Sequence, residues 1–496
     1  MMHPPRIVSD PTHREVESQN DKPLEMNWIN SKGEEIYLLV PKTVYPPRED
    51  TELLDLCISK IGNGNGRKLL EIGCGSGALS ISAANNGWRV TACDINPLAV
   101  VATKGNAERN KVKLELFEGG LDESNSNSDF LHHFENDGPF DLIVWNLPYL
   151  SPPLEGEPRL GPLEDAGLID SEGIEGWGEI LLNLINQKPT LLKKGGAIYL
   201  LHTNNPRGDL LQSTWRQSLW ATRIVGENDL ADGERLTCFS AWKPFQNKSI
   251  EWHDELGSTN LFMINQSKEI GDSVIAKTQT QGRGQRDREW ITKEGDFAGS
   301  WLLDPKLYDN RIGVIQLSAA LSVIDTYCTI TNLPLASSHW INCAAIGRQG
   351  ISIHWPNDVW AEEGKIAGCL IEGRQVGEKQ KLVLGIGVNL QSEYEQNFPI
   401  CGLRDIVDKE ISLKEFAELL NCSISSLFEL HALAPKINPH FNSIWQLMSK
   451  HLSIGKGLIQ NGEKMTVNSI NEEGELLCHD GKEVKIVRNS FTREWV

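Results

Sequence analysis

The stretch "KLLEIGCGSGALSISAANNG", residues 68–87, establishes the fold class of the first half of the chain. It has the pattern of a strand, a Gly-rich turn and a helix. The next stretch, "WRVTACDINPLAVVATKGNAERN" (88–110), repeats strand and helix, and "FDLIVWNLPY" (140–149) has the composition of a buried strand. Further strands are expected at "GGAIYLLHTN" (195–204) and "ERLTCFSAW" (234–242). Such alternation predicts an α/β domain with a parallel, doubly wound sheet.

The bulk composition limits the classes of protein to be considered. A chain of 496 residues is too long for one core, so two or more domains are expected. The net charge of −19 argues against broad binding to nucleic acid or anionic membranes, because polyanions would be repelled. Ten scattered cysteines without a C-x-x-C pair indicate reduced thiols. No leader-like or membrane-spanning apolar run is seen, so we expect a cytoplasmic protein that contacts no membrane.

A polar, Pro-containing stretch, "KPFQNKSI" (243–250), interrupts the α/β pattern and predicts a domain boundary. The tail "GEKMTVNSINEEGELLCHDGKEVKIV" (462–487) is rich in β-type residues and has two turn signals, which suits a small barrel. The predicted division is a polar N-terminal extension, a first domain, a second domain and a C-terminal domain, at 1–34, 35–243, 250–450 and 451–496.

The Gly-rich turn of the first domain has the features of a nucleoside-binding site. Gly73, Gly75 and Gly77 follow the predicted strand that contains Glu71, and glycines there let the backbone approach a ligand closely. Asp94 ends the next strand, where a carboxylate can accept hydrogen bonds from ribose hydroxyls. The G-x-G-x-G spacing favours S-adenosylmethionine, and NAD is the alternative.

The segment "WNLPYLSPP" (145–153) follows a buried strand at the same edge of the sheet. Asn146 offers a side-chain oxygen, and the backbone carbonyl of Leu147, fixed by Pro148, offers a second acceptor. Tyr149 offers a flat face. Two acceptors and an aromatic plane can hold a planar –NH2 group while its nitrogen attacks a methyl sulfonium. The alternative is a simple proline turn at the end of a strand.

On these residues the first half resembles the release-factor glutamine methyltransferases (HemK-like), which carry N-P-P-Y after a G-x-G-x-G motif. "VYPPREDTELL" (44–54) resembles the family segment that leads into the cofactor site. The resemblance implies a Rossmann-like methyltransferase whose S-adenosylmethionine contacts involve Glu71, the three glycines, Asp94 and Asn146. The implied substrate is a glutamine amide, and a peptide chain release factor is the implied partner. Two departures are Leu147, in place of the family's first Pro, and Gly120, in place of an acidic residue near the adenine.

Four motifs mark the second half of the chain. They are "GSTN" (257–260), "GRGQRDREW" (282–290), "HWPNDVWAEEGKIAGCLIE" (354–372) and "GIGVNL" (385–390). Each alone fits a common cap, a turn or a solvated loop. The Arg-rich stretch also fits a loop that folds around a phosphate or a carboxylate, because its arginines repel one another unless an anion brings them together. The joint occurrence of the four motifs in this order is much more specific than any one motif.

In these motifs the second half resembles the biotin protein ligases. That implies a mixed α+β, class II synthetase-like catalytic domain, an SH3-like C-terminal domain, and activation of biotin by ATP and Mg²⁺ through biotinyl-5′-AMP. By resemblance, Lys365 lies beside the biotin carboxylate and the bridging phosphate, Asn357 and Asp358 contact nucleotide and metal, and Asn389 contacts the nucleotide. The implied catalytic residues are Lys365, Arg283 and Asp358. The implied biotin contacts are Ser258, Thr259, Asn260, Gln279, Arg283, Gly284, Gln285 and Lys365. No structural metal site is implied.

Three residues depart from the ligase pattern: Gln285 and Asp287 in the Arg-rich loop, and His354 before W-P-N-D. Each removes positive charge or adds negative charge near the expected phosphate. We therefore expect the adenylate to be held less tightly than in typical relatives. The implied partner is a biotin carboxyl-carrier domain of a carboxylase. No helix-turn-helix pattern precedes the ligase motifs, so a DNA-binding role is not expected.

The sequence thus predicts a bifunctional enzyme, a methyltransferase fused to a biotin–protein ligase. One alternative is a ligase whose first domain binds S-adenosylmethionine or a partner without catalysis, which Gly120 and Leu147 favour. A second is a nucleic-acid amino-methyltransferase, against which the acidic charge counts. For the second domain, a lipoate ligase is the alternative, and the Arg-rich loop, W-P-N-D and the expected terminal barrel favour biotin.

Overall fold

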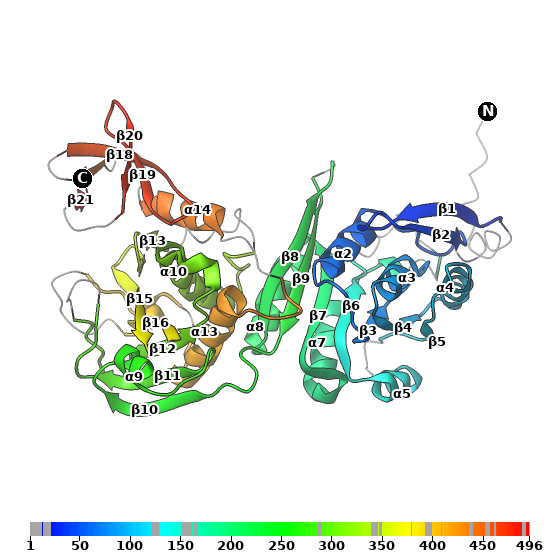
Figure 1. Cartoon of the computed structure of the whole chain (residues 1–496), viewed down its shortest axis with the longest axis horizontal. Coiled ribbons are helices and arrows are strands. Elements are labelled where there is room, and N and C mark those ends of the chain that lie inside the picture. Colours follow the sequence, from blue (N-terminus) through cyan, green and yellow to red (C-terminus); the bar gives the residue numbers. More distant parts are fainter. Residues whose placement is uncertain are drawn as a thin grey trace, which may run out of the picture. The chain divides into compact units, whose positions relative to one another are not determined.

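The chain divides into two compact units in a computed structural model (Figure 1). The structure describes residues 12, 21–121, 128–150, 161–162, 167–171, 173, 175–231, 233–284, 289–338, 346, 350–377, 379–391, 399–407, 409–435, 440–451, 457–460, 463–488 and 493–495. Unit 1 is residues 1–211, 223–242 and 431–435, and unit 2 is residues 212–222, 243–430 and 436–496. This division differs from the predicted continuous ranges, because 212–222 belong to unit 2 and 431–435 to unit 1.

The elements up to Trp242 alternate between strands and helices as the sequence predicts. They are β1 (Leu24–Ile29), β2 (Glu35–Val40), α2 (Glu49–Ser59), β3 (Lys68–Ile72), α3 (Ala78–Asn85), β4 (Arg89–Asp94), α4 (Pro97–Arg109), β5 (Glu115–Glu118), α5 (Ser128–Asp137), β6 (Phe140–Asn146), α7 (Trp177–Gln187), η1 (Pro189–Leu191), β7 (Leu192–Thr203), α8 (Pro206–Gln217), β8 (Ala221–Asp229) and β9 (Arg235–Trp242).

Seven of these strands form one sheet in the order β5-β4-β3-β6-β7-β9-β8. Strands β5, β4, β3, β6 and β7 are mutually parallel, and β9 pairs antiparallel to β7. The parallel strands are buried on both faces, as their continuous apolar runs predict. The strand order reverses at β3, with β4 on one side and β6 on the other. Crevices at such a point, beyond the carboxyl ends of the strands, are where open α/β sheets bind ligands.

The predicted polar extension over 1–34 contains a strand in its last part. Residues 24–29 form β1, which pairs antiparallel with β2 in a separate two-stranded sheet. Trp28 is buried in a cluster that includes Ile36 and Ile81. The alternation of apolar and polar residues in "LEMNWI" is the signal of a half-buried strand, and burial of the Trp28 ring outweighs the polar composition around it.

The second half of the chain contains the elements of a mixed sheet and its covering helices, followed by a smaller sheet. They are β10 (Ile250–Leu256), α9 (Thr259–Asn265), β11 (Ser273–Gln279), β12 (Phe297–Leu303), η2 (Leu307–Asn310), α10 (Ile312–Ile330), β13 (Ser352–His354), β14 (Asp358–Trp360), β15 (Lys365–Val376), β16 (Lys379–Val388), α12 (Leu403–Ile406), α13 (Leu413–Phe428), α14 (Phe441–His451), β17 (Gly457–Gln460), β18 (Glu463–Ile470), β19 (Leu476–His479), β20 (Val484–Val487) and β21 (Arg493–Trp495).

The larger sheet of unit 2 has seven strands in the order β10-β11-β12-β16-β15-β14-β13. Strands β10 and β11 run parallel and the other described pairs run antiparallel, so the predicted mixed α+β domain is present. Helices α10 and α13 lie beside one another (Figure 1). The C-terminal strands form a five-stranded sheet in the order β20-β19-β18-β17-β21. Helix α10 is long and apolar enough to span a membrane. However, 89% of its apolar 18-residue stretch is buried inside the fold, which is typical of a core helix.

Candidate functional site

Most of the residues predicted to bind a cofactor and an acceptor in the first half meet in one pocket of unit 1. The pocket has a volume of about 530 Å³ and lies at the carboxyl ends of β3, β4 and β6. Its lining includes the predicted residues Glu71, Gly73, Gly75, Asp94, Asn146, Leu147, Pro148 and Tyr149. It also includes Gly120 and most of the segment 44–54. The tertiary fold therefore brings together stretches that lie far apart in the sequence.

The predicted residue Gly77 is not among the residues that line the pocket. It precedes α3 with φ = +80°, a left-handed conformation that glycine adopts without strain. A Cβ at this position would lie 2.7 Å from the Cγ2 atom of Thr103, so a side chain would also clash. Gly77 therefore shapes the turn between β3 and α3, and its predicted contact with a ligand stays a prediction.

Two buried carboxyl groups, those of Glu71 and Asp94, line the pocket. The side-chain oxygens of Asp94 accept hydrogen bonds from the backbone N–H of Gly75 at 2.8 Å and of Asn96 at 2.9 Å. Burial outweighs these bonds and raises the pKa of Asp94. Burial also raises the pKa of Glu71 to about 8, although Ser80 donates a hydrogen bond to it, and the charge of Asp94 adds to the effect. A ligand with positive charge and hydroxyl donors would stabilise both carboxylates, which fits S-adenosylmethionine.

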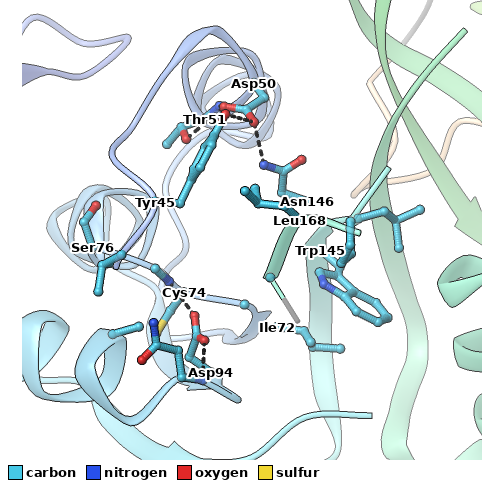
Figure 2. A pocket seen from close by; sticks show the side chains of 18 of the residues that line it. Tyr45, Asp50, Thr51, Ile72, Cys74, Ser76, Asp94, Trp145, Asn146 and Leu168 are labelled. Carbon is cyan, nitrogen blue, oxygen red and sulfur yellow. Dashed lines mark hydrogen bonds between the residues drawn. The ribbon is translucent and has the colours of Figure 1, made fainter. Parts of the chain in front are cut away.

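The side-chain amide of Asn146 is held in one orientation by Asp50, a residue in the quoted segment to which the sequence assigned no role (Figure 2). The Nδ2 group of Asn146 donates to the Oδ2 atom of Asp50 at 2.8 Å. The Tyr45 hydroxyl donates to the same oxygen at 3.0 Å, and the Thr51 backbone N–H donates to Oδ1 at 2.6 Å. Among the described residues, Asn146 Oδ1 is buried and has no hydrogen-bond partner. A carboxylate can accept hydrogen bonds but cannot donate them, so the Nδ2 group of Asn146 faces Asp50 and its Oδ1 atom faces away.

The aromatic side chains near Asn146 remain neutral over the physiological range. Burial raises the pKa of the Tyr45 and Tyr149 hydroxyls, and the charge of Asp50 is the next cause for both. Tyr45 therefore stays a hydrogen-bond donor to Asp50 over that range. Tyr149 lines the pocket, and its backbone carbonyl accepts a hydrogen bond from Asn205 Nδ2 at 3.2 Å.

In unit 2, the first two motif stretches meet through a chain of hydrogen bonds. The Oε1 atom of Gln279 accepts from the Thr259 backbone N–H at 2.8 Å and from its hydroxyl at 3.1 Å. Ser300 on β12 donates to Asn260 Oδ1 at 2.6 Å, and its Oγ lies 2.8 Å from Thr259 Oγ1. Ser258 caps α9, accepting from the Leu261 N–H at 3.5 Å. The predicted residues Thr259, Asn260 and Gln279 thus form one fixed polar cluster.

Glu372 joins this cluster to the Arg-rich loop, and the sequence assigned no role to it. Its Oε2 atom accepts from Asn260 Nδ2 at 2.7 Å, and its Oε1 atom accepts from Arg283 Nη1 at 3.4 Å. Arg283 forms an isolated antiparallel bridge with Glu289, so the described ends of the loop lie side by side. Gln285 and Asp287, on which the expectation of looser binding depends, lie outside the described residues. Gly284 is described and half-buried.

Lys365 and Asp358 form an ion pair at the start of β15, with 2.8 Å between Nζ and Oδ2. Lys365 is 14% exposed, and its Nζ lies 5.4 Å from the centre of the Trp290 ring. The ring occupies space left by glycines on neighbouring strands: a Cβ at Gly368 would lie 2.9 Å from it, and a Cβ at Gly387 would lie 2.2 Å from it. The motifs at 282–290, 354–372 and 385–390 therefore meet at one place in the fold.

The amides of Asn357 and Asn389 support the backbone that carries Lys365. Asn389 Nδ2 donates to the Lys365 carbonyl at 2.9 Å, and Asn357 Nδ2 donates to the Cys369 carbonyl at 2.8 Å. Their predicted contacts with a nucleotide stay predictions. His354 stacks on Trp360, with 4.6 Å between ring centres and an interplanar angle of 5°. Within the described ranges, no group of three His, Cys, Asp or Glu side chains is arranged to hold a metal ion.

Comparisons with known families divide the chain in the same way as the two sets of motifs. The ribosomal protein L11 methyltransferase family matches residues 52–148. The biotin/lipoate A/B protein ligase family matches residues 249–389. The first match contains the pocket residues from Leu54 to Pro148, and the pocket residues from Lys42 to Thr51 precede it. The second match contains all four ligase motifs up to Asn389.

Individual proteins of both kinds are similar to parts of this chain. A putative protein N5-glutamine methyltransferase of Methanocaldococcus jannaschii is 36% identical over 34% of this chain and 78% of its own length. A biotin–[acetyl-CoA-carboxylase] ligase of Paracoccus denitrificans is 40% identical over 24% of this chain and 43% of its own length. The structure of a biotin protein ligase of Aquifex aeolicus, solved with biotin and ATP, aligns at 24% identity and a TM-score of 0.40, covering 50% of this chain and 99% of that chain.

Proposed function

We propose that this chain, which belongs to the protein glutamine methyltransferase family and also carries a biotin/lipoate protein ligase domain, is a bifunctional enzyme that methylates a glutamine amide and attaches biotin to a carrier lysine. Each activity is supported by a separate set of residues. The methyltransferase residues lie in unit 1 and the ligase residues lie in unit 2.

The orientation of Asn146 carries the proposal for methyl transfer. Its buried Oδ1 has no partner among the described residues, and a buried acceptor without a partner is costly unless a ligand satisfies it. A glutamine amide can donate one N–H to Oδ1 and the other to the Leu147 carbonyl. Both acceptors then draw electron density toward the amide nitrogen and hold its plane against Tyr149.

S-adenosylmethionine would supply the methyl group, with Glu71 and Asp94 at its charged and hydroxyl groups. In the transfer, the bond from the amide nitrogen to the methyl carbon forms as the bond from sulfur to that carbon breaks. The nitrogen gains positive character and releases one proton. Asn146 stabilises that charge because its oxygen already accepts the N–H. No general base is required if the proton leaves after the carbon has been transferred.

The methyltransferase is tested with isotope-labelled S-adenosylmethionine and two acceptors, a peptide chain release factor and a DNA duplex. We expect the mass gain of one methyl group on one glutamine of the release factor, and loss of transfer in an Asn146→Ala variant that still binds S-adenosylmethionine. Label in the duplex would favour the nucleic-acid amino-methyltransferase instead. Cofactor binding without transfer to either acceptor would favour a non-catalytic first domain.

The ion pair of Lys365 and Asp358 beside Trp290 carries the proposal for ligation. Activation of a carboxylate by ATP brings two anions together, so a lysine amine at that point offsets the charge that develops. Lys365 is largely buried, and its ammonium group lies beside Asp358 of β14, Trp290 of the loop and Gly368 of β15, so it has a fixed position. Biotin would be held by the Thr259, Asn260 and Gln279 cluster, with Arg283 closing over the product of activation.

Ligation is tested by incubating the full chain with ATP, Mg²⁺, biotin and a biotin carboxyl-carrier domain. We expect a mass gain on one carrier lysine, and loss of this gain in a Lys365→Ala variant. An arm with lipoate in place of biotin distinguishes the two branches of the ligase family. Transfer of lipoate but not biotin would contradict the assignment of biotin as the substrate.

Finer parts of the proposal rest on resemblance. The five-stranded C-terminal sheet is proposed to be an SH3-like barrel next to the nucleotide, and the ligase domain to have a class II synthetase-like fold. Mg²⁺ is proposed to reach Asp358 together with ATP. The carrier domain and the release factor are proposed partners, and the proposed location is the cytoplasm.

A further inference from the structure

Helix α10 in the ligase unit contains a fully buried carboxylate. Asp325 is the one charged residue of this helix, and its side chain is 0% exposed. A buried carboxylate without compensation is strongly destabilising, so a fold that contains one must supply a cation and hydrogen-bond donors. Ser337 supplies two donors: its backbone N–H lies 2.9 Å from Oδ1, and its hydroxyl donates to Oδ2.

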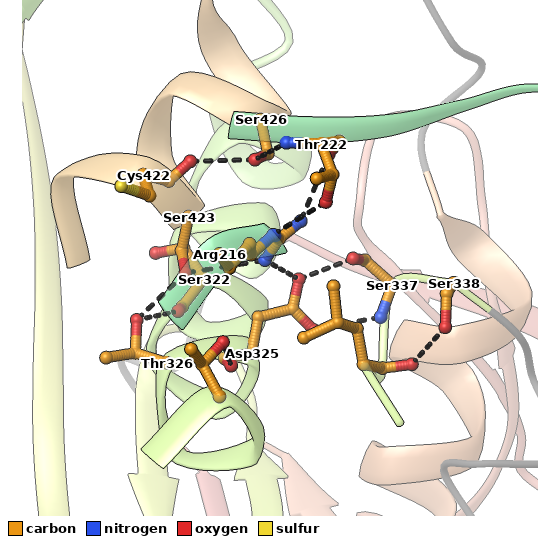
Figure 3. A network of polar contacts seen from close by, with 12 residues as sticks. Arg216, Thr222, Ser322, Asp325, Thr326, Ser337, Ser338, Cys422, Ser423 and Ser426 are labelled. Carbon is orange, nitrogen blue, oxygen red and sulfur yellow. Dashed lines mark hydrogen bonds and ion pairs between the residues drawn. The ribbon is translucent and has the colours of Figure 1, made fainter. Parts of the chain in front are cut away.

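The cation is Arg216, which comes from the sequence range that carries the methyltransferase (Figure 3). Its Nη1 atom lies 2.9 Å from Oδ2 of Asp325, and its side chain is 1% exposed. Thr222 accepts from Nε at 3.0 Å and from Nη2 at 3.2 Å, and Ser423 on α13 accepts from Nη1 at 3.4 Å. The pair is therefore surrounded by hydrogen-bond partners, which a buried ion pair requires.

Arg216 belongs to residues 212–222, which form part of unit 2 although they precede the ligase motifs in the sequence. This segment has further bonds in the unit. Gln217 Nε2 donates to the Thr329 carbonyl at 2.8 Å, and the Thr222 N–H donates to Ser426 Oγ at 3.0 Å. The segment thus contacts both α10 and α13.

Unit 1 contains a segment from the opposite part of the sequence. Residues 431–435 follow α13, yet they belong to unit 1. The Tyr199 hydroxyl donates to the Leu433 carbonyl at 2.8 Å, and Arg223 Nη1 donates to the Ala434 carbonyl at 2.9 Å. The His431 ring stacks on Trp242, with 5.2 Å between ring centres. Each unit therefore contains a short segment from the sequence range of the other.

We propose that this exchange of segments makes the two enzymes obligate parts of one chain: residues 212–222 complete the fold of the ligase unit, with Arg216 as its essential cation. The proposal goes beyond either activity and depends on neither. It implies that a substitution in the methyltransferase range weakens the ligase fold selectively. It also implies that a ligase fragment beginning at the sequence boundary near residue 243 would leave Asp325 buried without its cation.

The test is hydrogen exchange on the full-length chain carrying Arg216→Met, which removes the charge and keeps most of the side-chain volume. Breaking one partner of a buried pair should accelerate exchange at the amides of α10 and α13 on the order of 100-fold. Amides of β3 and β4 in unit 1 should change by a few-fold at most. Equal acceleration in both units, or none in α10 and α13, would overturn the proposal.

Two further variants distinguish the effect of losing the buried ion pair from a general effect of substitution on stability. Arg207→Met changes another arginine of the same helix, one that pairs with Asp170 at 3.1 Å and is 44% exposed. It should leave α10 and α13 unchanged. If Arg216→Met does not fold, Ser426→Ala removes the acceptor of the Thr222 N–H, together with the bond from the Ser426 hydroxyl to the Cys422 carbonyl. It should accelerate exchange at Thr222 and in the last turn of α13. No acceleration at these amides would contradict the role of the segment.

Discussion

Replacing Asp50 with Asn tests whether this carboxylate sets the orientation of Asn146. In the wild type, Asp50 only accepts hydrogen bonds, so the Nδ2 group of Asn146 must face it. An Asn at position 50 has nearly the same shape but can donate through its own NH2 group. The amide of Asn146 can then turn over, which would present a donor instead of an acceptor to the substrate amide.

The expected fall in kcat/KM follows from the hydrogen bond that is lost. A hydrogen bond to a charged group contributes about 1.5–3 kcal/mol, which corresponds to a fall in kcat/KM of about 10- to 150-fold. The binding of S-adenosylmethionine should change much less, because neither Asp50 nor Asn146 Nδ2 is assigned to its charged groups. Methyl transfer to the release factor, measured at saturating S-adenosylmethionine, gives kcat/KM, and calorimetric titration gives the cofactor Kd.

The matched control is Tyr45→Phe. It removes the hydroxyl that donates to Asp50 at 3.0 Å but keeps the bond between Asp50 and Asn146, so its effect on kcat/KM should be smaller. The proposed role of Asp50 is wrong if Asp50→Asn keeps kcat/KM within about 2-fold of the wild type. It is also wrong if the Kd for the cofactor rises by the same factor as kcat/KM falls, because Asp50 would then act on the cofactor.

Three further predictions concern the cofactor pocket, the ligase site and the pH dependence of stability. A Cβ at Gly120 would be in ordinary contact distance, 3.6 Å from its nearest neighbour, so Gly120→Asp should be tolerated. It should tighten S-adenosylmethionine binding about 5- to 10-fold by one hydrogen bond, as measured by calorimetry, and unchanged affinity would contradict this. Gly387→Ala should displace the Trp290 ring, since the new Cβ would lie 2.2 Å from it. Biotin transfer should then fall about 10-fold or more, and unaltered transfer would show that the ring is not needed there. Burial lowers the pKa of His431 to about 4 from the usual 6.5, so the unfolded chain binds more protons between these values. The contribution of the neutral His431 side chain to the free energy of unfolding is fully present above pH 6.5 and is lost progressively as the pH falls toward 4. Relative to a His431→Phe variant, the wild type should lose about 1–2 kcal/mol of unfolding free energy between about pH 7 and pH 5 in urea titrations, and a pH-independent difference would contradict the lowered pKa.

In each of the two sites, short-range sequence patterns pointed to some residues and gave no role to others. Gly73 and Gly75 after β3, Asp94 at the end of β4 and Asn146 at the end of β6 line the pocket. They were predicted together because parallel strands present their carboxyl ends at one edge of the sheet. Asp50 and Glu372 were inside quoted stretches, but no pattern gave them a role. Each acts through a bond to a distant residue, 96 positions away for Asp50 and Asn146 and 112 positions away for Glu372 and Asn260.

Local patterns were enough to predict the two families, the parallel sheet and the mixed sheet, because periodicity, turn chemistry and motif order are properties of neighbouring residues. The composition of the two units could not be obtained in this way. The folded chain places Arg216 against Asp325, 109 positions away, and brings residues 431–435 into unit 1. The physical reason is that a buried charge selects its partner by distance and desolvation in the folded state, and neither quantity is encoded by the residues next to it in the sequence.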